Sequence, residues 1–314
     1  MKKLSMIVSV YNEEGNLTHF AEVADGVRKS LSERENPWEA EIIYVNDGSV
    51  DASPSILNDL ASKDSACKVI HLSRNFGHEA AMIAGIDHAT GEFLVCLDAD
   101  LQNPPELVPK MIDEYEKDYD IVLMAREENK SAGFFRKITS NAFYGLLNRL
   151  SGTKFERNVS DFFGISGRVA EILRNDYREK NRYLRGFVQQ VGFKKSVLTY
   201  KAPERFAGKS KYSVKKLTKM AIHTLNCFSV TPLRAGAFAA GLSVILTIAS
   251  LAYYIAFWII EGYGSGTALL CSLLTFLFSV LFILLGVIGE YLGGIMNELR
   301  NRPIYIVDEK KNLN

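Results

Sequence analysis

Short apolar runs alternate with helical stretches over the first hundred residues of the chain. The apolar runs are rich in β-branched residues and have the length of buried strands. The predicted strands are Leu4–Val10, Glu41–Val45, Lys68–Leu72 and Phe93–Leu97. The predicted helices between them are Leu17–Glu33, Ser55–Lys63 and His78–His88. This alternation predicts βαβ units and therefore an α/β domain with a mainly parallel sheet.

Two long apolar runs follow near the C-terminus. Residues 236–260 and 268–289 contain no Asp, Glu, Lys or Arg, and each is longer than the roughly 20 residues that cross about 30 Å of hydrocarbon as a helix. The connector 261–267 has no Lys or Arg, whereas Arg234, Arg300 and Arg302 flank the other ends. The positive-inside rule then predicts both termini in the cytoplasm and the hairpin tip outside. Two buried core helices are the alternative, but soluble helices of this length usually show a polar stripe.

A basic amphipathic segment precedes the first apolar run. Its apolar residues recur at helical spacing, and they are Leu217, Met220, Ala221, Leu225 and Phe228. Such a helix suits the headgroup layer of an anionic leaflet, and packing on the α/β domain is the alternative. The expected organisation is a cytoplasmic α/β domain (1–204), a juxtamembrane segment (205–232), two transmembrane helices in 233–295 (about 236–260 and 268–291), and a cytoplasmic tail (296–314).

Charge and cysteine content narrow the classes of partner. The chain has 37 basic and 36 acidic residues, a net charge of +1, so nothing indicates nucleic acid as the partner. The four cysteines are scattered without paired spacing. A disulfide framework or a zinc site is therefore not expected, and a reducing compartment fits.

Acidic clusters come directly after the first, second and fourth predicted strands. They are Tyr11-Asn12-Glu13-Glu14, the Asn46–Asp51 turn and Asp98-Ala99-Asp100-Leu101-Gln102. The carboxyl ends of parallel strands meet at one edge of the sheet, where ligands bind. Carboxylates gathered there repel one another, so the edge needs a cation or a set of hydrogen-bond donors.

The third cluster has the spacing expected of a metal site. Asp98 and Asp100 lie two residues apart, so in an extended segment they share a face, and Gln102 continues the alternation with a neutral oxygen. Mg²⁺ or Mn²⁺ that bridges diphosphate oxygens is the natural ligand of such a set. Acidic pairs at strand ends also cap helices, which is the alternative for an isolated D-x-D.

Several further motifs extend the pattern: Ser73-Arg74-Asn75-Phe76-Gly77, Arg205-x-x-Gly208-Lys209-Ser210-Lys211-Tyr212, Gly286–Gly293 and Asn301-Arg302-Pro303. With these motifs the chain resembles, nearly end to end, the family 2 polyprenyl-phosphate glycosyltransferases, which include dolichol-phosphate mannose synthases and bacterial bactoprenol glucosyltransferases. The resemblance implies a GT-A fold, a nucleotide-diphosphate sugar donor, a divalent metal and an inverting transfer (EC 2.4 class). It makes residues 1–204 the catalytic domain.

The resemblance also implies roles for individual residues. The donor nucleotide-sugar would be bound by Tyr11, Glu13, Asn46, Asp47 and Asp98. The metal would be bound by Asp98, Asp100 and Gln102, and the catalytic carboxylates would be Asp98, Asp100 and Asp161. The acceptor phosphate would be bound by Arg126, Arg136, Arg205, Ser210 and Lys211.

The implied reaction moves a hexose, glucose or N-acetylglucosamine, from a UDP-sugar to undecaprenyl phosphate at the plasma membrane. A lipid phosphate needs no general base, because its second pKa is near ~6. Phe163 stands where the family usually has Arg, and the family's Trp is missing from 185–192, so the sugar is left open. We also expect a homo-oligomer (a tetramer, as in relatives), with a separate flippase and a downstream transferase.

Three other functions fit parts of the sequence less well. A processive polysaccharide synthase would share the first half of the chain, but Trp38 and Trp258 are the only tryptophans, and neither lies in a Q-x-x-R-W motif. A catalytically inactive membrane scaffold would not need an intact D-x-D-x-Q. A Rossmann oxidoreductase would need a G-x-G-x-x-G after the first strand, which the chain lacks.

Overall fold

The protein divides into two compact units. The computed structural model describes residues 1–127, 148, 155–180, 182–203, 231–261 and 266–313. One unit comprises Met1–Val214 together with Pro303–Asn314, and the other comprises Lys215–Arg302. The last residues of the chain thus return to the first unit. The predicted juxtamembrane segment, 205–232, lies almost wholly outside the described residues.

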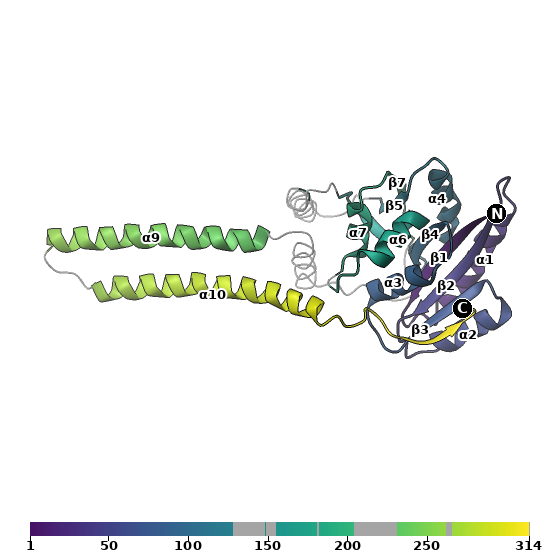
Figure 1. Cartoon of the computed structure of the whole chain (residues 1–314), viewed down its shortest axis with the longest axis horizontal. Coiled ribbons are helices and arrows are strands. Elements are labelled where there is room, and N and C mark those ends of the chain that lie inside the picture. The colour runs from purple at the N-terminus through teal and green to yellow at the C-terminus, as the bar shows by residue number, and fades with distance from the viewer. Residues whose placement is uncertain (128–147, 149–154, 181, 204–230, 262–265, 314) are drawn as a thin grey trace. The chain divides into compact units, whose positions relative to one another are not determined.

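The first unit is built on one eight-stranded sheet with the order β7-β5-β6-β4-β1-β2-β3-β8 (Figure 1). Its strands are β1 (Lys2–Val10), β2 (Trp38–Asn46), β3 (Cys67–Leu72), β4 (Phe93–Asp98), β5 (Ile121–Arg126), β6 (Val159–Ser166), β7 (Lys195–Tyr200) and β8 (Val307–Lys311). Strands β1 to β4 are mutually parallel where they pair, which confirms the predicted mainly parallel sheet. Strand β6 runs antiparallel to both β4 and β5, and β8 runs antiparallel to β3.

Helices cover both faces of this sheet. They are α1 (Leu17–Ser32), α2 (Ser53–Lys63), α3 (His78–His88), η1 (Pro105–Leu107), α4 (Val108–Tyr115), α6 (Gly167–Asn175) and α7 (Leu184–Gln190). On one face Phe20 of α1 and Met111 of α4 join a core with Met6 and Val8 of β1, all at most 1% exposed. The central strands are apolar on both faces because helices bury both.

Helix α3 lies unusually close to the opposite face. A Cβ on Gly85 would stand 2.2 Å from Cγ2 of Ile7 and 3.3 Å from Cγ2 of Val45. Only glycine permits this approach. The close packing holds α3, which begins at His78, against the sheet.

The second unit contains two apolar helices, α9 (Thr231–Glu261) and α10 (Gly266–Leu299), which pack on each other. Gly241–Ile260 and Phe276–Leu299 have mean hydropathies of 2.0 and 2.1, long and apolar enough to cross a membrane. Only 6% and 0% of these windows are buried. Core helices of a soluble protein would be enclosed, so this exposure argues against the buried-core alternative.

The chain after α10 adds a strand that the sequence pattern does not predict. Strand β8 pairs with β3 at the edge of the sheet (Figure 1). The Ser73 N–H donates to the Ile306 carbonyl at 2.9 Å, and the Tyr305 hydroxyl donates to Asp87 at 2.8 Å. The predicted tail 296–314 is therefore divided between the end of α10 and a segment folded onto the sheet.

Candidate active site

The predicted carboxylates meet at one edge of the sheet. Strand β4 ends at Asp98, which is paired with Ser9 near the end of β1. Strand β6 runs the other way and has Cys96 opposite Phe163. Continuing that register by two residues brings Asp161, at the start of β6, opposite Asp98.

Asp98 is held by side chains from three other segments. Its Oδ1 accepts a hydrogen bond from the Ser9 hydroxyl at 3.3 Å and lies 3.4 Å from Nδ1 of His78. Its Oδ2 accepts a hydrogen bond from Nδ2 of Asn103 at 3.0 Å. Ser9 Oγ and His78 Nδ1 are themselves 2.8 Å apart. The carboxylate is thus fixed in orientation while 28% of the side chain stays exposed.

The charge of Asp98 is poorly compensated by the protein. Burial raises its pKa, and the nearby carboxylates Asp161 and Asp100 raise it further, although His78 and Ser9 oppose this shift. Burial alone would lower the pKa of His78, but Asp98, Asp161 and Glu79 outweigh it and raise that pKa. Excess negative charge at this edge favours binding of a cation.

The D-x-D-x-Q segment is a turn and not an extended strand. Strand β4 ends at Asp98, and Leu101 has a φ of 61°. The turn lets the Gln102 N–H donate to Oδ1 of Asp100 at 3.0 Å. The expected strand-like alternation through Gln102 is therefore wrong, because the chain reverses as soon as the sheet ends.

The donor set fits a hard cation shared with a ligand. Each carboxylate oxygen can accept two hydrogen bonds or metal bonds, and the protein contacts of Asp98 leave acceptor positions on Oδ2. Among the described residues, no group of three or more His, Cys, Asp and Glu side chains is arranged to hold a metal. A cation such as Mg²⁺ would therefore take further oxygens from phosphate or water, as it usually does.

A second loop pair at the same edge surrounds Asp47. This residue is 2% exposed, and its two oxygens accept the N–H groups of Phe76 and Gly77 at 2.7 and 2.9 Å. Burial raises the pKa of Asp47, although these two N–H groups oppose it. The next residue, Gly48, has a φ of 65°, and a Cβ there would lie 2.4 Å from the Arg74 carbonyl carbon. The turn after β2 and the loop after β3 are therefore locked together.

The other predicted donor residues lie beside this turn. Tyr11 is 47% exposed at the end of β1. The Glu13 N–H donates to Ser53 Oγ at 3.0 Å. Asn46 is 3% exposed, with its Nδ2 at 2.9 Å from His71 Nδ1 and its Oδ1 accepting the Ser49 N–H at 3.0 Å. Asn46 thus shapes the turn, whereas Tyr11 presents a ring at the surface of the edge.

Asp161 faces a cation from α7. Its Oδ2 lies 3.7 Å from Nη1 of Arg185, and Arg185 also donates to the Tyr183 hydroxyl at 2.8 Å. Glu79, in the first turn of α3, accepts the Leu184 N–H at 2.6 Å. Burial raises the pKa of Glu79, and the charge of Asp161 adds to the effect. The start of α7 thus closes one side of the acidic edge.

Arg126 is the last residue of β5, at the same edge as Asp98. Its Nε donates to the Tyr200 hydroxyl at 3.2 Å. The remaining predicted acceptor-phosphate residues lie outside the described residues, namely Arg136, Arg205, Ser210 and Lys211.

Comparison with known proteins identifies the family of the chain. The model of glycosyl transferase family 2 matches residues 5–172. This chain belongs to glycosyl transferase family 2. It is a glycosyltransferase with a GT-A fold.

Two relatives match this glycosyltransferase over nearly its whole length. A bactoprenol glucosyl transferase of Shigella phage SfX is 36% identical over 98% of this chain and 100% of its own. An uncharacterized glycosyltransferase, YkcC of Bacillus subtilis (strain 168), is 34% identical over 97% and 93%. A solved glucosyl-3-phosphoglycerate synthase from Mycobacterium tuberculosis is 15% identical, with a TM-score of 0.46 over 72% of this chain and 78% of that one.

Four residues of this glycosyltransferase edge were not singled out from the sequence as site residues: Ser9, His78, Asn103 and Tyr200. His78 belongs to no metal-binding spacing in the sequence, yet it contacts Asp98 as the first residue of α3. Its place directly after the Ser73–Gly77 motif was the available signal. Nothing local marks Tyr200, which ends β7 far along the chain from its partners.

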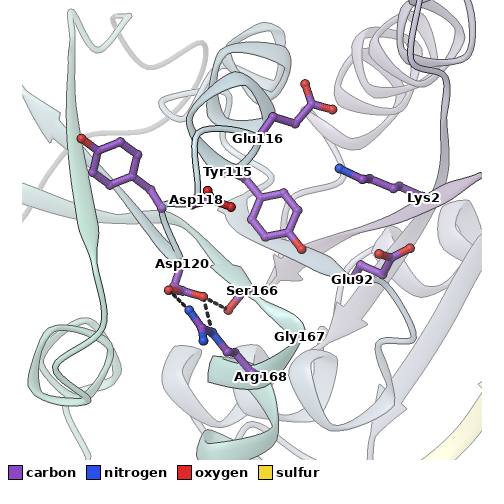
Figure 2. Close-up of a pocket in the computed structure, with 10 residues that line it drawn as sticks. Lys2, Glu92, Tyr115, Glu116, Asp118, Asp120, Ser166, Gly167 and Arg168 are labelled. Carbon is purple, nitrogen blue, oxygen red and sulfur yellow. Dashed lines mark hydrogen bonds and ion pairs between the residues drawn. The ribbon is translucent and has the colours of Figure 1, made fainter.

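A different cavity, of about 560 Å³, opens at the opposite edge of the sheet (Figure 2). It is lined by Lys2, Glu92 and Asp120, which lie at the amino ends of β1, β4 and β5, and by Arg168, which pairs with Asp120. Asp98 and Arg126, which are predicted site residues, end β4 and β5 at the other edge of the sheet. The predicted active site is therefore not this cavity.

Proposed function

We propose that this glycosyltransferase transfers glucose from UDP-glucose to undecaprenyl phosphate, with inversion and with Mg²⁺ or Mn²⁺. The strongest support is that Asp98 and Arg126 end parallel strands, so that carboxylates for a metal-bound diphosphate and a cation for an acceptor phosphate lie at one edge of the sheet. Relatives named bactoprenol glucosyl transferases match 97–98% of this chain and favour glucose over N-acetylglucosamine.

The donor half of the reaction needs stabilisation of a leaving diphosphate. Asp98, Asp100 and Gln102 would hold the metal, which supplies Lewis-acid stabilisation of the departing charge. Tyr11, Glu13, Asn46 and Asp47 would form the nucleoside side of the site, and the locked turn around Asp47 keeps that side rigid.

The acceptor half needs positioning and no general base. A phosphate oxygen attacks the anomeric carbon, the bond from that carbon to the diphosphate oxygen breaks, and UDP leaves with the bonding electrons. Arg126 would hold the attacking phosphate, together with Arg136, Arg205, Ser210 and Lys211.

Asp161 would orient the transferred sugar. Its pairing with Arg185 limits its rotation while leaving it 35% exposed. A carboxylate held in this way offers acceptors for sugar hydroxyls close to Asp98.

The apolar helices α9 and α10 would anchor the enzyme in the plasma membrane, with the catalytic unit and both termini in the cytoplasm. An acceptor in the inner leaflet would then present its phosphate to the basic juxtamembrane segment. The product would need a separate flippase and an outward-facing transferase, and the helices would also support a homo-oligomer, such as a tetramer.

The test is a transfer assay with the full chain in detergent. Purified enzyme receives radiolabelled UDP-glucose, UDP-N-acetylglucosamine or UDP-galactose with undecaprenyl phosphate, with and without EDTA. We expect one labelled sugar per lipid from UDP-glucose and no product with EDTA. No lipid product from any donor would overturn the proposal, and a ladder of longer products would favour a processive synthase.

The acceptor role has its own variant. Replacing both Arg126 and Arg136 by alanine should abolish lipid-linked product while UDP binding, measured by calorimetry, stays intact. Normal product from this double variant would exclude the arginines as the acceptor-phosphate site.

A further inference from the structure

Three buried polar side chains lie between the donor carboxylate Asp98 and the acceptor arginine Arg126. They are Asn103, Ser160 and Tyr200, with exposed fractions of 0%, 5% and 4%. Burial of polar groups costs free energy unless they are hydrogen-bonded to one another. These three are, and they connect the two halves of the site.

The connection is a chain of hydrogen bonds with a fixed direction. Arg126 Nε donates to the Tyr200 hydroxyl at 3.2 Å, and that hydroxyl donates to Oδ1 of Asn103 at 3.0 Å. Asn103 Nδ2 then donates to Oδ2 of Asp98 at 3.0 Å. A guanidinium only donates and an ionised carboxylate only accepts. The two charged ends therefore fix the orientation of both the Asn103 amide and the Tyr200 hydroxyl between them.

Ser160 holds the phenol from a third side. Its hydroxyl donates to the Met124 carbonyl at 3.0 Å, and its oxygen lies 3.1 Å from the Tyr200 hydroxyl. Because Met124 and Ser160 belong to β5 and β6, the sheet itself holds the middle of the chain. The Tyr200 end of the link is thus held by strands, whereas Asn103 lies in the turn after β4.

The bond to Tyr200 occupies only one edge of the Arg126 guanidinium. A guanidinium has five N–H donors, and the contact through Nε leaves the four on its two Nη groups for an anionic ligand. A side chain held through Nε can present its Nη groups as a fork to a phosphate.

We propose that Tyr200 and Asn103 are positioning residues that hold Arg126 in register with Asp98, so that acceptor phosphate and donor sugar are aligned for attack. This inference rests on the proposed function. Neither residue needs to touch a substrate, because both are buried. Their effect is on alignment, to which glycosyl transfer is sensitive at the scale of about 1 Å.

Tyr200→Phe removes the hydroxyl and keeps the ring. The ring packs edge-on against Phe162, with centroids 5.8 Å apart, and the variant preserves this contact. Tyr44→Phe is the matched control, since the hydroxyl of Tyr44 is also buried but has no hydrogen-bond partner among the described residues. We expect kcat/KM for the polyprenyl phosphate to fall about 10- to 100-fold in Tyr200→Phe. Tyr44→Phe should transfer glucose at the wild-type rate.

The deciding measurement is a double-mutant cycle with Arg126→Ala. If Tyr200 acts through Arg126, the double variant loses no more activity than Arg126→Ala alone. If Tyr200 had only a structural role, the fold-losses of activity in the two single variants would multiply in the double variant. That result would overturn the inference, and so would wild-type activity in Tyr200→Phe. If Tyr200→Phe does not fold, Asn103→Ala replaces it in the double-mutant cycle with Arg126→Ala, and the same comparison of activities applies. Wild-type enzyme that transfers no sugar to polyprenyl phosphate would overturn the proposed function instead.

Discussion

Glu41 and Asp98 are carboxylates of the same sheet with opposite surroundings. Glu41 lies towards the amino ends of the strands and is 3% exposed. It accepts hydrogen bonds from Ser5 Oγ at 2.5 Å and from the Thr90 N–H at 2.9 Å, and it lies 2.8 Å from the Lys68 ammonium. Burial alone would raise the pKa of Glu41, but these partners and a second lysine lower it to about 2.

Asp98 lies at the carboxyl ends of the strands and has the reverse balance. Burial raises its pKa, two nearby carboxylates add to the rise, and its partners, two neutral side chains and one histidine, do not offset it. A carboxylate with a complete set of internal donors and cations stabilises the fold. One whose charge the protein leaves uncompensated is available to an external cation. We therefore expect the amino edge of the sheet to contribute to stability and the carboxyl edge to catalysis.

The largest expected effect is the loss of catalysis in Asp98→Asn. Removing this proposed metal ligand should reduce glucosyl transfer by about 10³-fold, which corresponds to several kcal/mol of transition-state stabilisation. The melting temperature should stay level or rise, because a disfavoured charge is removed. Transfer assays and thermal unfolding of the detergent-solubilised chain measure both.

Asp118→Asn is its control, as the same substitution at an exposed residue near the opposite edge. Transfer and melting temperature should both be unchanged there. If Asp98→Asn lowered the melting temperature by several degrees, Asp98 would also stabilise the fold, and the contrast between the two edges would fail.

Glu41→Gln should affect stability and not catalysis. A pKa of about 2 in the folded state, against the usual value of 4.5 for a glutamate, corresponds to about 3 kcal/mol of stabilisation. Because the folded-state pKa is lowered, this stabilisation is present above pH ~4.5 and is lost as the pH falls towards ~2. The melting temperature of the variant should therefore fall less than that of the wild type as the pH is lowered from 7 towards ~2.

Glu39→Gln, an exposed residue of the same strand, is the matched control and should leave the unfolding curve unchanged. If Glu41→Gln lowered kcat at temperatures where it is folded, the amino-end network would have to act on the active site.

The strands, and the position of the acidic clusters at their carboxyl ends, were predictable because their signals are local. The strand predicted at Leu4–Val10 spans Lys2–Val10 in the structure, and the one predicted at Phe93–Leu97 spans Phe93–Asp98. Strand β8 was not predicted, since Val307–Lys311 is mostly charged and pairs through backbone groups at the edge of the sheet. The antiparallel direction of β6 depends on long-range pairing, which no local pattern contains.

The link between Asp98 and Arg126 was unpredictable for the same reason. Tyr200 is 97 residues from Asn103 and 74 from Arg126 along the chain. Its hydroxyl has a role only because β5 and β7 pair in a register that places Arg126 opposite Tyr200. Carboxylates at strand ends are visible in a sequence, whereas the groups that orient them are defined by the folded sheet.

A smaller effect is expected at the turn that holds Asp47. Gly48→Ala forces a side chain into a φ of 65° and against the Arg74 backbone, a strain of about 1–3 kcal/mol. Because this turn and the 73–77 loop hold Asp47, the KM for UDP-glucose should rise by about tenfold, which calorimetry with UDP can check.

Gly15→Ala is the control in the neighbouring loop, where nothing lies within 4 Å of an added Cβ. Unchanged UDP affinity in Gly48→Ala would mean that the nucleoside side of the carboxyl edge does not depend on the shape of this turn.

The smallest effect is expected from Asn312→Ala in the tail that follows the apolar helices. Asn312 Nδ2 donates to the carbonyls of Ala61 and Cys67 at 2.7 and 2.8 Å, which ties the tail to the end of α2 and the start of β3. Both contacts lie at the amino edge, so the variant should lower stability by about 1 kcal/mol, or a few degrees in melting temperature, with unchanged kinetics.

Lys310→Ala, exposed on β8, is the control and should change neither the melting temperature nor the kinetics. A raised KM for UDP-glucose in Asn312→Ala would instead mean that the tail acts on the donor loop through the bond between Ser73 and Ile306. The two edges would then be coupled through β3, and stability and chemistry would not be separable along this sheet.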